Sequence, residues 1–230
     1  MVIGNGLLAK KFYTYNNSDN YIVFASGVSN SGNKIKSEFN REKDLLLNTI
    51  ANNPGKTIIY FGTCSVYDRV LSSSPYVLHK LAMEELLTKQ ADNYHIFRIS
   101  NLAGKTENPN TVLNYFAQHI LNQSPFSLWA NSSRNIIDID DAFLVCDYII
   151  QNALFTNEIV NIANPDNYPV SDIVAVLETH FNQKGNYSLV EKESNPVIDT
   201  SAIKGIIAKL NINFDSNYLP RTIEKYFPVK

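Results

Sequence analysis

Short apolar runs alternate with longer amphipathic stretches along this chain. Runs rich in β-branched and aromatic residues predict buried strands, and stretches with apolar residues three and four positions apart predict helices. The predicted strands are residues 1–4, 21–25, 57–61, 94–99, 126–129, 135–139 and 158–162. The predicted helices are residues 36–52, 75–89, 111–121, 140–151, 171–180, 201–210 and 219–227, with one more opening after Gly6.

This alternation of strands and helices predicts an α/β fold, a Rossmann-like doubly wound parallel sheet. Ligands of such sheets bind at the carboxyl ends of the strands. Gly4, Ser26, Thr63 and Asn101 each follow a predicted strand, so we expect them at that edge. Their coincidence is stronger evidence for a binding site than any one motif.

The first predicted strand runs into a G-x-G-x-x-A turn at Gly4–Ala9. In a dinucleotide site the first Gly permits the turn, the second lets the backbone approach a pyrophosphate, and Ala9 permits close packing. A Gly-rich turn without a ligand is the alternative. The strand at residues 21–25 ends without an acidic residue for an adenosine ribose, and residues 10–20 are too few for another strand–helix pair.

Residues 60–80 carry the candidate chemistry. A hydroxyl-rich bend, Thr63–Ser65, follows a strand, and Ser74 with Pro75 predicts a helix start. Tyr76 and Lys80, four positions apart, share one face of that helix. An ammonium beside a phenol lowers the phenol's pKa, which predicts a proton donor, its tuner and an orienting hydroxyl. The alternative is a surface Tyr and Lys, and the same spacing recurs at Tyr226 and Lys230 without a preceding strand.

Composition narrows the function classes. A chain of 230 residues can form one domain, or one domain with a small lobe. The net charge of −2 and the lack of a basic run predict no nucleic-acid partner. No apolar run reaches membrane-spanning length, and no signal peptide is expected. Cys64 and Cys146 have neither metal nor disulfide spacing, so we expect no metal and a cytoplasmic location.

The chain resembles the extended short-chain dehydrogenase/reductase family, the nucleotide-sugar epimerases, dehydratases and reductases. The resemblance covers nearly the whole chain. It rests on FASG (24–27), YFGTCSVY (60–67), PYVLHK (75–80), RISNLAG (98–104), NTVLNYFAQHI (110–120), FSLW (126–129) and SSRNIIDIDDA (132–142).

The resemblance implies a role for each matched residue. Tyr76 is the expected acid/base, Lys80 its tuner and a ribose ligand, and Thr63 the substrate-orienting hydroxyl. The expected cofactor site is Gly4, Gly6, Leu7, Leu8, Ala9, Ala25, Ser26, Gly27, Tyr76 and Lys80, holding NAD or NADP. The expected nucleotide-sugar site is Thr63, Ser65, Asn101, Thr111, Trp129 and Arg134, with Trp129 under the base and Arg134 on the diphosphate.

Several departures from the family pattern matter. The second and third strands of the sheet are missing, which shortens the adenosine half of the cofactor site. Asp138 replaces the usual His, and Asp138, Asp140 and Asp141 are read as helix caps, with Asp140 or Asp141 favoured. Dehydratases of the family place Thr-Asp-Glu at the bend, where this chain has Thr63-Cys64-Ser65, so we expect no elimination of water.

The expected division is a dinucleotide-binding core, residues 1–107 with 135–162, and a small C-terminal substrate-binding lobe, residues 108–134 with 163–230. The expected function is NAD(P)-dependent reduction of a keto group on a nucleotide-linked (deoxy)sugar. An epimerase with tightly bound NAD and a non-catalytic binding module remain alternatives. A homodimer through helices 36–52 and 75–89 is a further expectation implied by the resemblance.

The remaining polar residues receive plain interpretations. Lys10 and Lys11 are candidates for a 2′-phosphate of NADP, although a solvated helix face is favoured. The histidines are read as surface or core residues, and Cys64 as a packing residue. The four histidines are His79, His95, His119 and His180.

Overall fold

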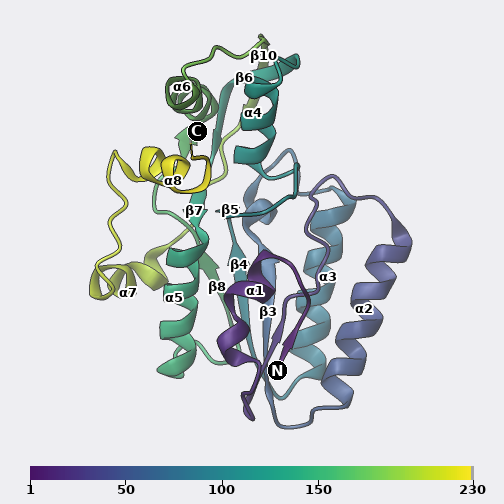
Figure 1. Ribbon diagram of the computed structural model, residues 1–230. Coiled ribbons are helices and arrows are strands. Elements are labelled where there is room, and N and C mark those ends of the chain that lie inside the picture. Colours follow the sequence, from purple (N-terminus) through teal and green to yellow (C-terminus); the bar gives the residue numbers. More distant parts are fainter. Residues whose placement is uncertain (229–230) are drawn as a thin grey trace.

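The computed structural model describes residues 1–228, whose centre is one parallel sheet (Figure 1). Five strands lie in the order β1-β2-β3-β4-β8, and every neighbouring pair is parallel. They are β1 (Val2–Ile3), β2 (Tyr21–Phe24), β3 (Thr57–Thr63), β4 (Asn93–Ile99) and β8 (Glu158–Ile162). The predicted fold class is confirmed, and the strand ends differ from the predicted ones by a residue or two.

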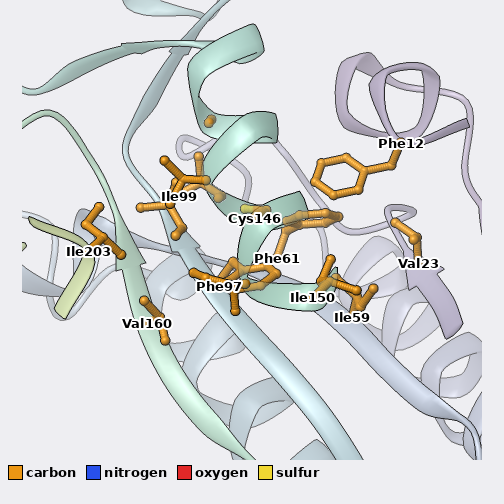
Figure 2. Packing of buried hydrophobic residues seen from close by; sticks show 14 of the residues in the cluster. Phe12, Val23, Ile59, Phe61, Phe97, Ile99, Cys146, Ile150, Val160 and Ile203 are labelled. Carbon is orange, nitrogen blue, oxygen red and sulfur yellow. The ribbon is translucent and has the colours of Figure 1, made fainter. Parts of the chain in front are cut away.

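Helices cover both faces of this sheet (Figure 1). On one face α2 (Lys36–Ala51) and α3 (Pro75–Gln90) lie side by side, and on the other lie α1 (Leu7–Lys11) and α5 (Ile139–Gln151). Alternate residues of a strand point to opposite faces, so Ile58 and Tyr60 pack toward α2 and α3 while Ile59 and Phe61 pack toward α5. Figure 2 shows the second of these clusters.

At its N-terminal edge the sheet has few strands and a short connection, as predicted. In the described part of the chain β1 pairs only with β2, so it is an edge strand. The connection between them holds only α1 and a 3₁₀ turn at Tyr13–Tyr15. With five residues, α1 sums few peptide dipoles and offers less charge at its N-terminus than the full helix expected after Gly6.

A second group of elements continues from the sheet (Figure 1). Its strands are β5 (Asn101–Ala103) paired with β7 (Ile136–Asp138), and β6 (Phe126–Arg134) between β9 (Tyr168–Pro169) and β10 (Tyr187–Ser194). Its helices are α4 (Val112–Leu121), α6 (Val170–Phe181) and α8 (Tyr218–Tyr226). They enclose a separate apolar cluster that includes Leu113, Ile173 and Leu219. The two-part division of the chain stays a proposal.

Several predicted helix ends are wrong. Asp138, rather than Asp140 or Asp141, caps α5, because its Oδ1 accepts the Asp140 N–H at 2.8 Å. The predicted cap Ser171 lies inside α6, where its hydroxyl donates to Asp172. The predicted helix at 201–210 is a 3₁₀ turn, Ser201–Ile203, followed by α7 (Lys204–Lys209).

Two further findings bear on the sequence-based expectations. Of the Tyr226–Lys230 pair, Lys230 lies outside the described residues. Across residues 1–228, we find no helix that combines the length and the apolar character a bilayer crossing requires.

Candidate active site

Two glycines shape the turn between β1 and α1. Gly4 has φ +125°, and a Cβ there would lie 2.3 Å from the Ala25 carbonyl oxygen at the end of β2. Gly6 has φ −76°, and a Cβ there would meet no heavy atom within 4 Å. Ala9 is buried behind the turn. Gly4 is therefore required by backbone packing, while the backbone at Gly6 borders open space that a ligand can approach.

The two leucines of the turn point into the protein. The Leu7 side chain lies against Gly104, where a Cβ would come within 2.9 Å of it, and Leu8 packs on the core beneath α5. Both side chains thus anchor the turn, and their backbone groups remain the part that a cofactor could contact.

The chain after β2 passes directly over Lys80. A Cβ at Gly27 would lie 2.5 Å from Lys80 Nζ and 2.9 Å from Glu42 Oε1. The preceding residue, Ser26, is held by Arg41 of α2, whose Nη2 donates to the Ser26 carbonyl at 2.9 Å. The structure therefore brings the Ala25–Gly27 segment and Lys80 together, as the sequence predicts.

The Lys80 ammonium uses all three of its donors inside the protein. Lys80 Nζ donates to Glu42 Oε1 at 3.0 Å, to the Tyr60 hydroxyl at 3.2 Å and to the Phe61 carbonyl at 3.4 Å. The side chain is almost completely buried. A ribose hydroxyl would have to take the place of one of these acceptors to bind Lys80.

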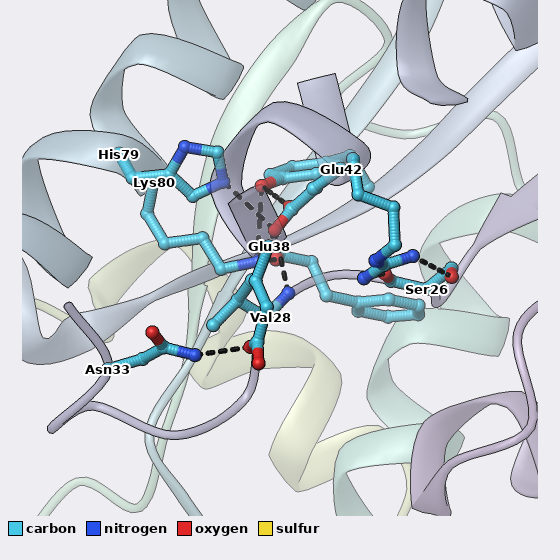
Figure 3. Close-up of polar contacts among 10 residues, drawn as sticks. Ser26, Val28, Asn33, Glu38, Glu42, His79 and Lys80 are labelled. Carbon is cyan, nitrogen blue, oxygen red and sulfur yellow. Dashed lines mark hydrogen bonds and ion pairs between the residues drawn. The ribbon is translucent and has the colours of Figure 1, made fainter. Parts of the chain in front are cut away.

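Glu42 is the centre of this buried network (Figure 3). Besides Lys80, its carboxylate accepts the Tyr60 hydroxyl at 2.7 Å and the Val28 N–H at 2.6 Å, and His79 Nε2 lies 3.0 Å away. Burial alone would raise the pKa of Glu42, but the His79 hydrogen bond, the Lys80 charge and the other donors lower it. Glu42 is therefore a carboxylate with no exposed surface.

Tyr76 lies beside Thr63, but its pKa moves against the predicted direction. Burial raises the pKa of Tyr76 to about 12, the Thr63 hydroxyl opposes this rise, and the Glu42 charge adds to it. The Lys80 charge faces Glu42 at 3.0 Å. In this structure burial sets the direction of the pKa shift of Tyr76, and the lowering by Lys80 stays a prediction.

The predicted substrate residues are held mainly by the backbone around them. Thr63 Oγ1 accepts the Ser65 N–H at 3.1 Å, which orders the bend after β3. Asn101 donates its side-chain amide to the Asn135 carbonyl at 2.7 Å. Thr111 occupies the N-cap position of α4 without a side-chain cap. Thr63 is the last residue of β3, and Asn101 and Thr111 follow β4 in the chain.

Trp129 and Arg134 both lie on β6, and two positively charged side chains contact the Trp129 ring. Lys192 Nζ of β10 lies 3.7 Å from the centre of the Trp129 ring, and the Arg134 guanidinium lies 5.0 Å from it. Arg134 also donates to Ser194, which in turn donates to Asp68. A base that stacks on Trp129 must use the ring face that Lys192 leaves free, or displace Lys192.

Comparison with protein families matches residues 21–163, more than half of the chain, to the NAD dependent epimerase/dehydratase family. The chain belongs to this family. The resemblance inferred from the sequence is thereby confirmed, and with it an NAD-dependent enzyme of the short-chain dehydrogenase/reductase type. A search of curated proteins found no match to this sequence.

Solved structures of the same type share the fold at low identity. The UDP-glucose 4-epimerase of Thermus thermophilus, in complex with NAD, has a TM-score of 0.71 and 12% identity over 94% of this chain and 81% of that chain. The UDP-N-acetylglucosamine 4-epimerase of Bacillus cereus has 0.66 and 21% over 97% and 81%. The dTDP-glucose 4,6-dehydratase of Bacillus anthracis str. Ames, in complex with NAD, has 0.68 and 14% over 95% and 76%.

The residues of this epimerase/dehydratase family member fit NAD at one end of its site. The open face at Gly6 and the close approach of the Gly27 backbone to Lys80 form a cradle that a side chain at either position would narrow. At the other end β1 is the sheet edge, so the strands that would flank an adenosine are missing from the described residues. Lys11 is engaged by Asp140 at 2.6 Å, which leaves the exposed Lys10 as the freer candidate for a 2′-phosphate.

The roles of Glu42 and His79 were not apparent from the sequence. Glu42 lies three positions after Phe39 and four before Leu46, within the apolar stripe of α2, and a charge in such a stripe signals a buried partner. His79 was read as an ordinary surface or core residue, but it contacts Glu42. Cys64 donates its thiol to the Arg98 carbonyl at 3.1 Å, and burial raises its pKa to about 12, which makes it a poor nucleophile.

Proposed function

We propose that this family member is an NAD(P)-dependent reductase of a keto group on a nucleotide-linked (deoxy)sugar. The observation that carries the proposal is a buried Tyr76 hydroxyl beside Thr63, on the same helix α3 as the buried Lys80. A neutral phenol donates a proton to an oxygen that gains negative charge, which is what reduction of a ketone requires. When bound, the cofactor supplies the hydride that the carbonyl carbon receives.

Each catalytic residue has a separate task in this proposal. Tyr76 donates its proton to the carbonyl oxygen, and the Thr63 hydroxyl hydrogen-bonds the same oxygen and orients the substrate. Lys80 fixes the nicotinamide ribose by exchanging one of its present acceptors for a ribose hydroxyl. General acid catalysis of this kind contributes roughly 10²–10⁴ in rate.

The cofactor would be held at two places. The backbone of Gly4, Gly6, Leu7 and Leu8 faces the pyrophosphate, with Ala9 packed behind it. The segment Ala25–Gly27, with Tyr76 and Lys80, faces the nicotinamide ribose. We propose either NAD or NADP, since Lys10 is the one candidate contact to a 2′-phosphate that the sequence analysis named and that no acidic side chain engages in the described residues.

The nucleotide sugar is proposed to lie along the residues that follow β3 and β4 and along β6. Ser65 and Asn101 would contact the sugar, Thr111 and Arg134 the diphosphate, and Trp129 the base. The support is chemical: Arg134 is a charge-assisted donor for phosphate, and Trp129 offers an aromatic face.

Trp129 gives a direct test of base stacking, because it is the only Trp in the sequence. We expect UDP or dTDP to quench its fluorescence, whereas the free sugar leaves it unchanged. Stacking of a base on an aromatic ring is worth about 1–3 kcal/mol, so Trp129→Leu should weaken nucleotide binding by roughly 5- to 150-fold in calorimetry. Leu189→Ala, an exposed change on the neighbouring β10, is the control. Equal quenching by sugar alone would contradict base stacking.

Two alternatives stand beside the reductase. An epimerase would retain tightly bound NAD through both half-reactions, which suits a complete adenosine pocket better than a site at a sheet edge. A non-catalytic binding module would explain the fully engaged Lys80. Dehydratase chemistry is disfavoured because the bend carries Cys64 and Ser65 in place of carboxylic acids.

The purified protein should be assayed for stoichiometric oxidation of added NADH or NADPH with a panel of nucleotide-linked keto sugars. The reductase predicts consumption of cofactor that depends on one of these substrates. NAD that copurifies, with no net consumption, would favour the epimerase. Binding of a nucleotide sugar by calorimetry, with no hydride transfer in any pairing, would favour the binding module.

A cytoplasmic homodimer completes the proposal. Leu78 and Leu81 of α3 are exposed on the helix layer that the dimer would use, with exposed fractions of 54% and 37%. Cys64 and Cys146 are free thiols, which suits a reducing compartment. Leu78→Glu should shift the elution volume from dimer to monomer if α3 forms the interface.

A further inference from the structure

We propose that Ser194 is a positioning residue that holds one edge of the Arg134 guanidinium inside the protein and leaves its other edge open to a diphosphate. Ser194 belongs neither to the predicted site nor to the motifs that carry the family resemblance. The inference rests on the proposed function, because it takes Arg134 as the residue that contacts the diphosphate of the nucleotide sugar. Ser194 then decides which way this guanidinium faces.

The Arg134 guanidinium has no carboxylate in ion-pair contact within residues 1–228. Arg98, by contrast, pairs with Glu84 at 2.6 Å. Arg134 instead donates from Nη1 to the Ser133 carbonyl at 2.7 Å and to Ser194 Oγ at 3.1 Å. A partly buried positive charge that lacks a carboxylate in contact favours the approach of an anion.

The hydrogen bonds of Arg134 divide its guanidinium into two edges. A guanidinium has five donors, and two parallel donors on one edge can bind a phosphate group together. Both hydrogens of Nη1 have acceptors in the protein. In the part of the chain that the structure describes, Nε and Nη2 have no acceptor, and neither atom is enclosed. The edge formed by Nε and Nη2 is therefore the one that a phosphate can bind.

The Ser194 hydroxyl is oriented by the Asp68 carboxylate. A hydroxyl has one hydrogen to donate, and its lone pairs accept. Ser194 donates its hydrogen to Asp68 Oδ2 at 2.7 Å, so its lone pairs remain to accept from Arg134. The exposed fractions of Ser194 and Asp68 are 4% and 5%, which leaves little room for water to replace either group. Hydrogen bonds in series of this kind strengthen one another.

Asp68 also connects Arg134 to the bend that carries Thr63. Asp68 directly follows the 3₁₀ turn Cys64–Tyr67, which begins after Thr63. Its second carboxylate oxygen, Oδ1, accepts the Val70 N–H at 2.9 Å, so both oxygens have a partner. The contacts from Asp68 to Arg134 therefore fix the proposed diphosphate contact relative to the hydroxyl that is proposed to orient the keto group.

Ser194→Ala tests this role, because it removes the hydroxyl and changes no charge. We expect calorimetry with UDP and with dTDP to show roughly two- to tenfold weaker binding than in the wild type, which corresponds to the loss of one hydrogen bond. The affinity for NADH should stay unchanged. Unchanged affinity for UDP and dTDP in Ser194→Ala, or no binding of either by the wild type, would overturn the proposal.

Ser132→Ala is the matched control on the same pair of strands, β6 and β10 (Figure 1). Ser132 is also buried, and its hydroxyl donates to the Lys192 carbonyl at 2.7 Å. Both substitutions remove one hydrogen bond between the strands, but only Ser194→Ala removes a contact of Arg134. Equal losses of UDP affinity in the two variants would show that Ser194 only supports the strands.

A double-mutant cycle with Arg134→Met shows whether Ser194 acts through Arg134. Arg134→Met alone should weaken UDP binding at least tenfold, because a charge-assisted contact to phosphate is lost. In that background Ser194→Ala should have no further effect, since the guanidinium that it holds is absent. Losses that add in full would contradict the proposal.

Ser194→Cys is the second variant if Ser194→Ala fails to fold. Its thiol is close to the hydroxyl in size but is a weak donor and a weak acceptor. Weaker binding of UDP is expected here too, and it should again disappear in the Arg134→Met background. Wild-type affinity in Ser194→Cys would count against the role of Ser194.

These experiments separate the two proposals. If UDP affinity depends on Ser194 through Arg134 while no nucleotide-linked keto sugar is reduced, the reductase is refuted and the role of Ser194 stands. If a keto sugar is reduced while Ser194→Ala binds UDP as tightly as the wild type, only the role of Ser194 is refuted.

Discussion

Tyr76→Phe should lower the turnover number by roughly 10²–10⁴ while leaving the fold and the affinity for cofactor unchanged. The substitution removes one hydroxyl whose neighbour is Thr63, and it leaves the ring packed against Val28 and Val77. The loss should appear in kcat, because the proton is needed in the transition state and not for binding. Steady-state kinetics with the best keto-sugar substrate, together with calorimetry for the cofactor, measure both quantities.

The control for this experiment is Tyr13→Phe, which makes the same chemical change at a residue with an exposed fraction of 68%. It should leave kcat unaltered. Turnover by Tyr76→Phe within about threefold of the wild type, well below the usual contribution of a general acid, would remove Tyr76 from the mechanism.

Gly4→Ala should lower the free energy of unfolding by roughly 2–5 kcal/mol. Two costs add: a side chain at φ +125° is strained, and its Cβ would lie 2.3 Å from the Ala25 carbonyl oxygen, a backbone atom that cannot rotate away. For a chain of this length the midpoint of thermal unfolding should fall by roughly 5–15 °C. Calorimetric unfolding measures the change.

Gly6→Ala is the matched variant on the same turn. Its backbone, at φ −76°, accepts Ala without strain, and the added Cβ meets no atom within 4 Å. Stability should therefore be unchanged, but the methyl group would occupy the space through which a pyrophosphate reaches the backbone, and we expect at least tenfold weaker cofactor binding. Wild-type affinity in Gly6→Ala would show that the cofactor does not lie against this turn.

Residues that act within a few positions of one another were predictable from the sequence. The apolar strand at 57–61, the Ser74 cap and the helix that begins at Pro75 depend on local patterns, and the structure has all three. The contact of Thr63 with Tyr76 follows from the same local order, because one short turn and loop separate β3 from α3. The turn at Gly4–Ala9 was also predictable, because its signal lies in neighbouring residues.

Residues that depend on distant partners were not predictable. Lys80 meets Glu42 across 38 positions, and no spacing rule reports that distance. The same is true of Asp138, which binds Lys225 and Tyr226 from a helix 87 and 88 positions away and is buried by them. β10 was not predicted from the sequence, because most of its side chains are exposed. Its residues therefore lack the alternation of apolar and polar positions that marks a half-buried strand.

The pairing of β6 with β10 bears on the order in which the protein folds. The two strands run parallel and join residues about sixty positions apart, as Ser132 and Lys192 do. Closing so long a connection costs entropy before any contact repays it, so strand pairs of this kind form slowly. During synthesis β6 must wait for β10, whereas α4 and α6, which share an apolar cluster with Phe126 and Leu128, precede β10 in the chain and can cover these side chains earlier.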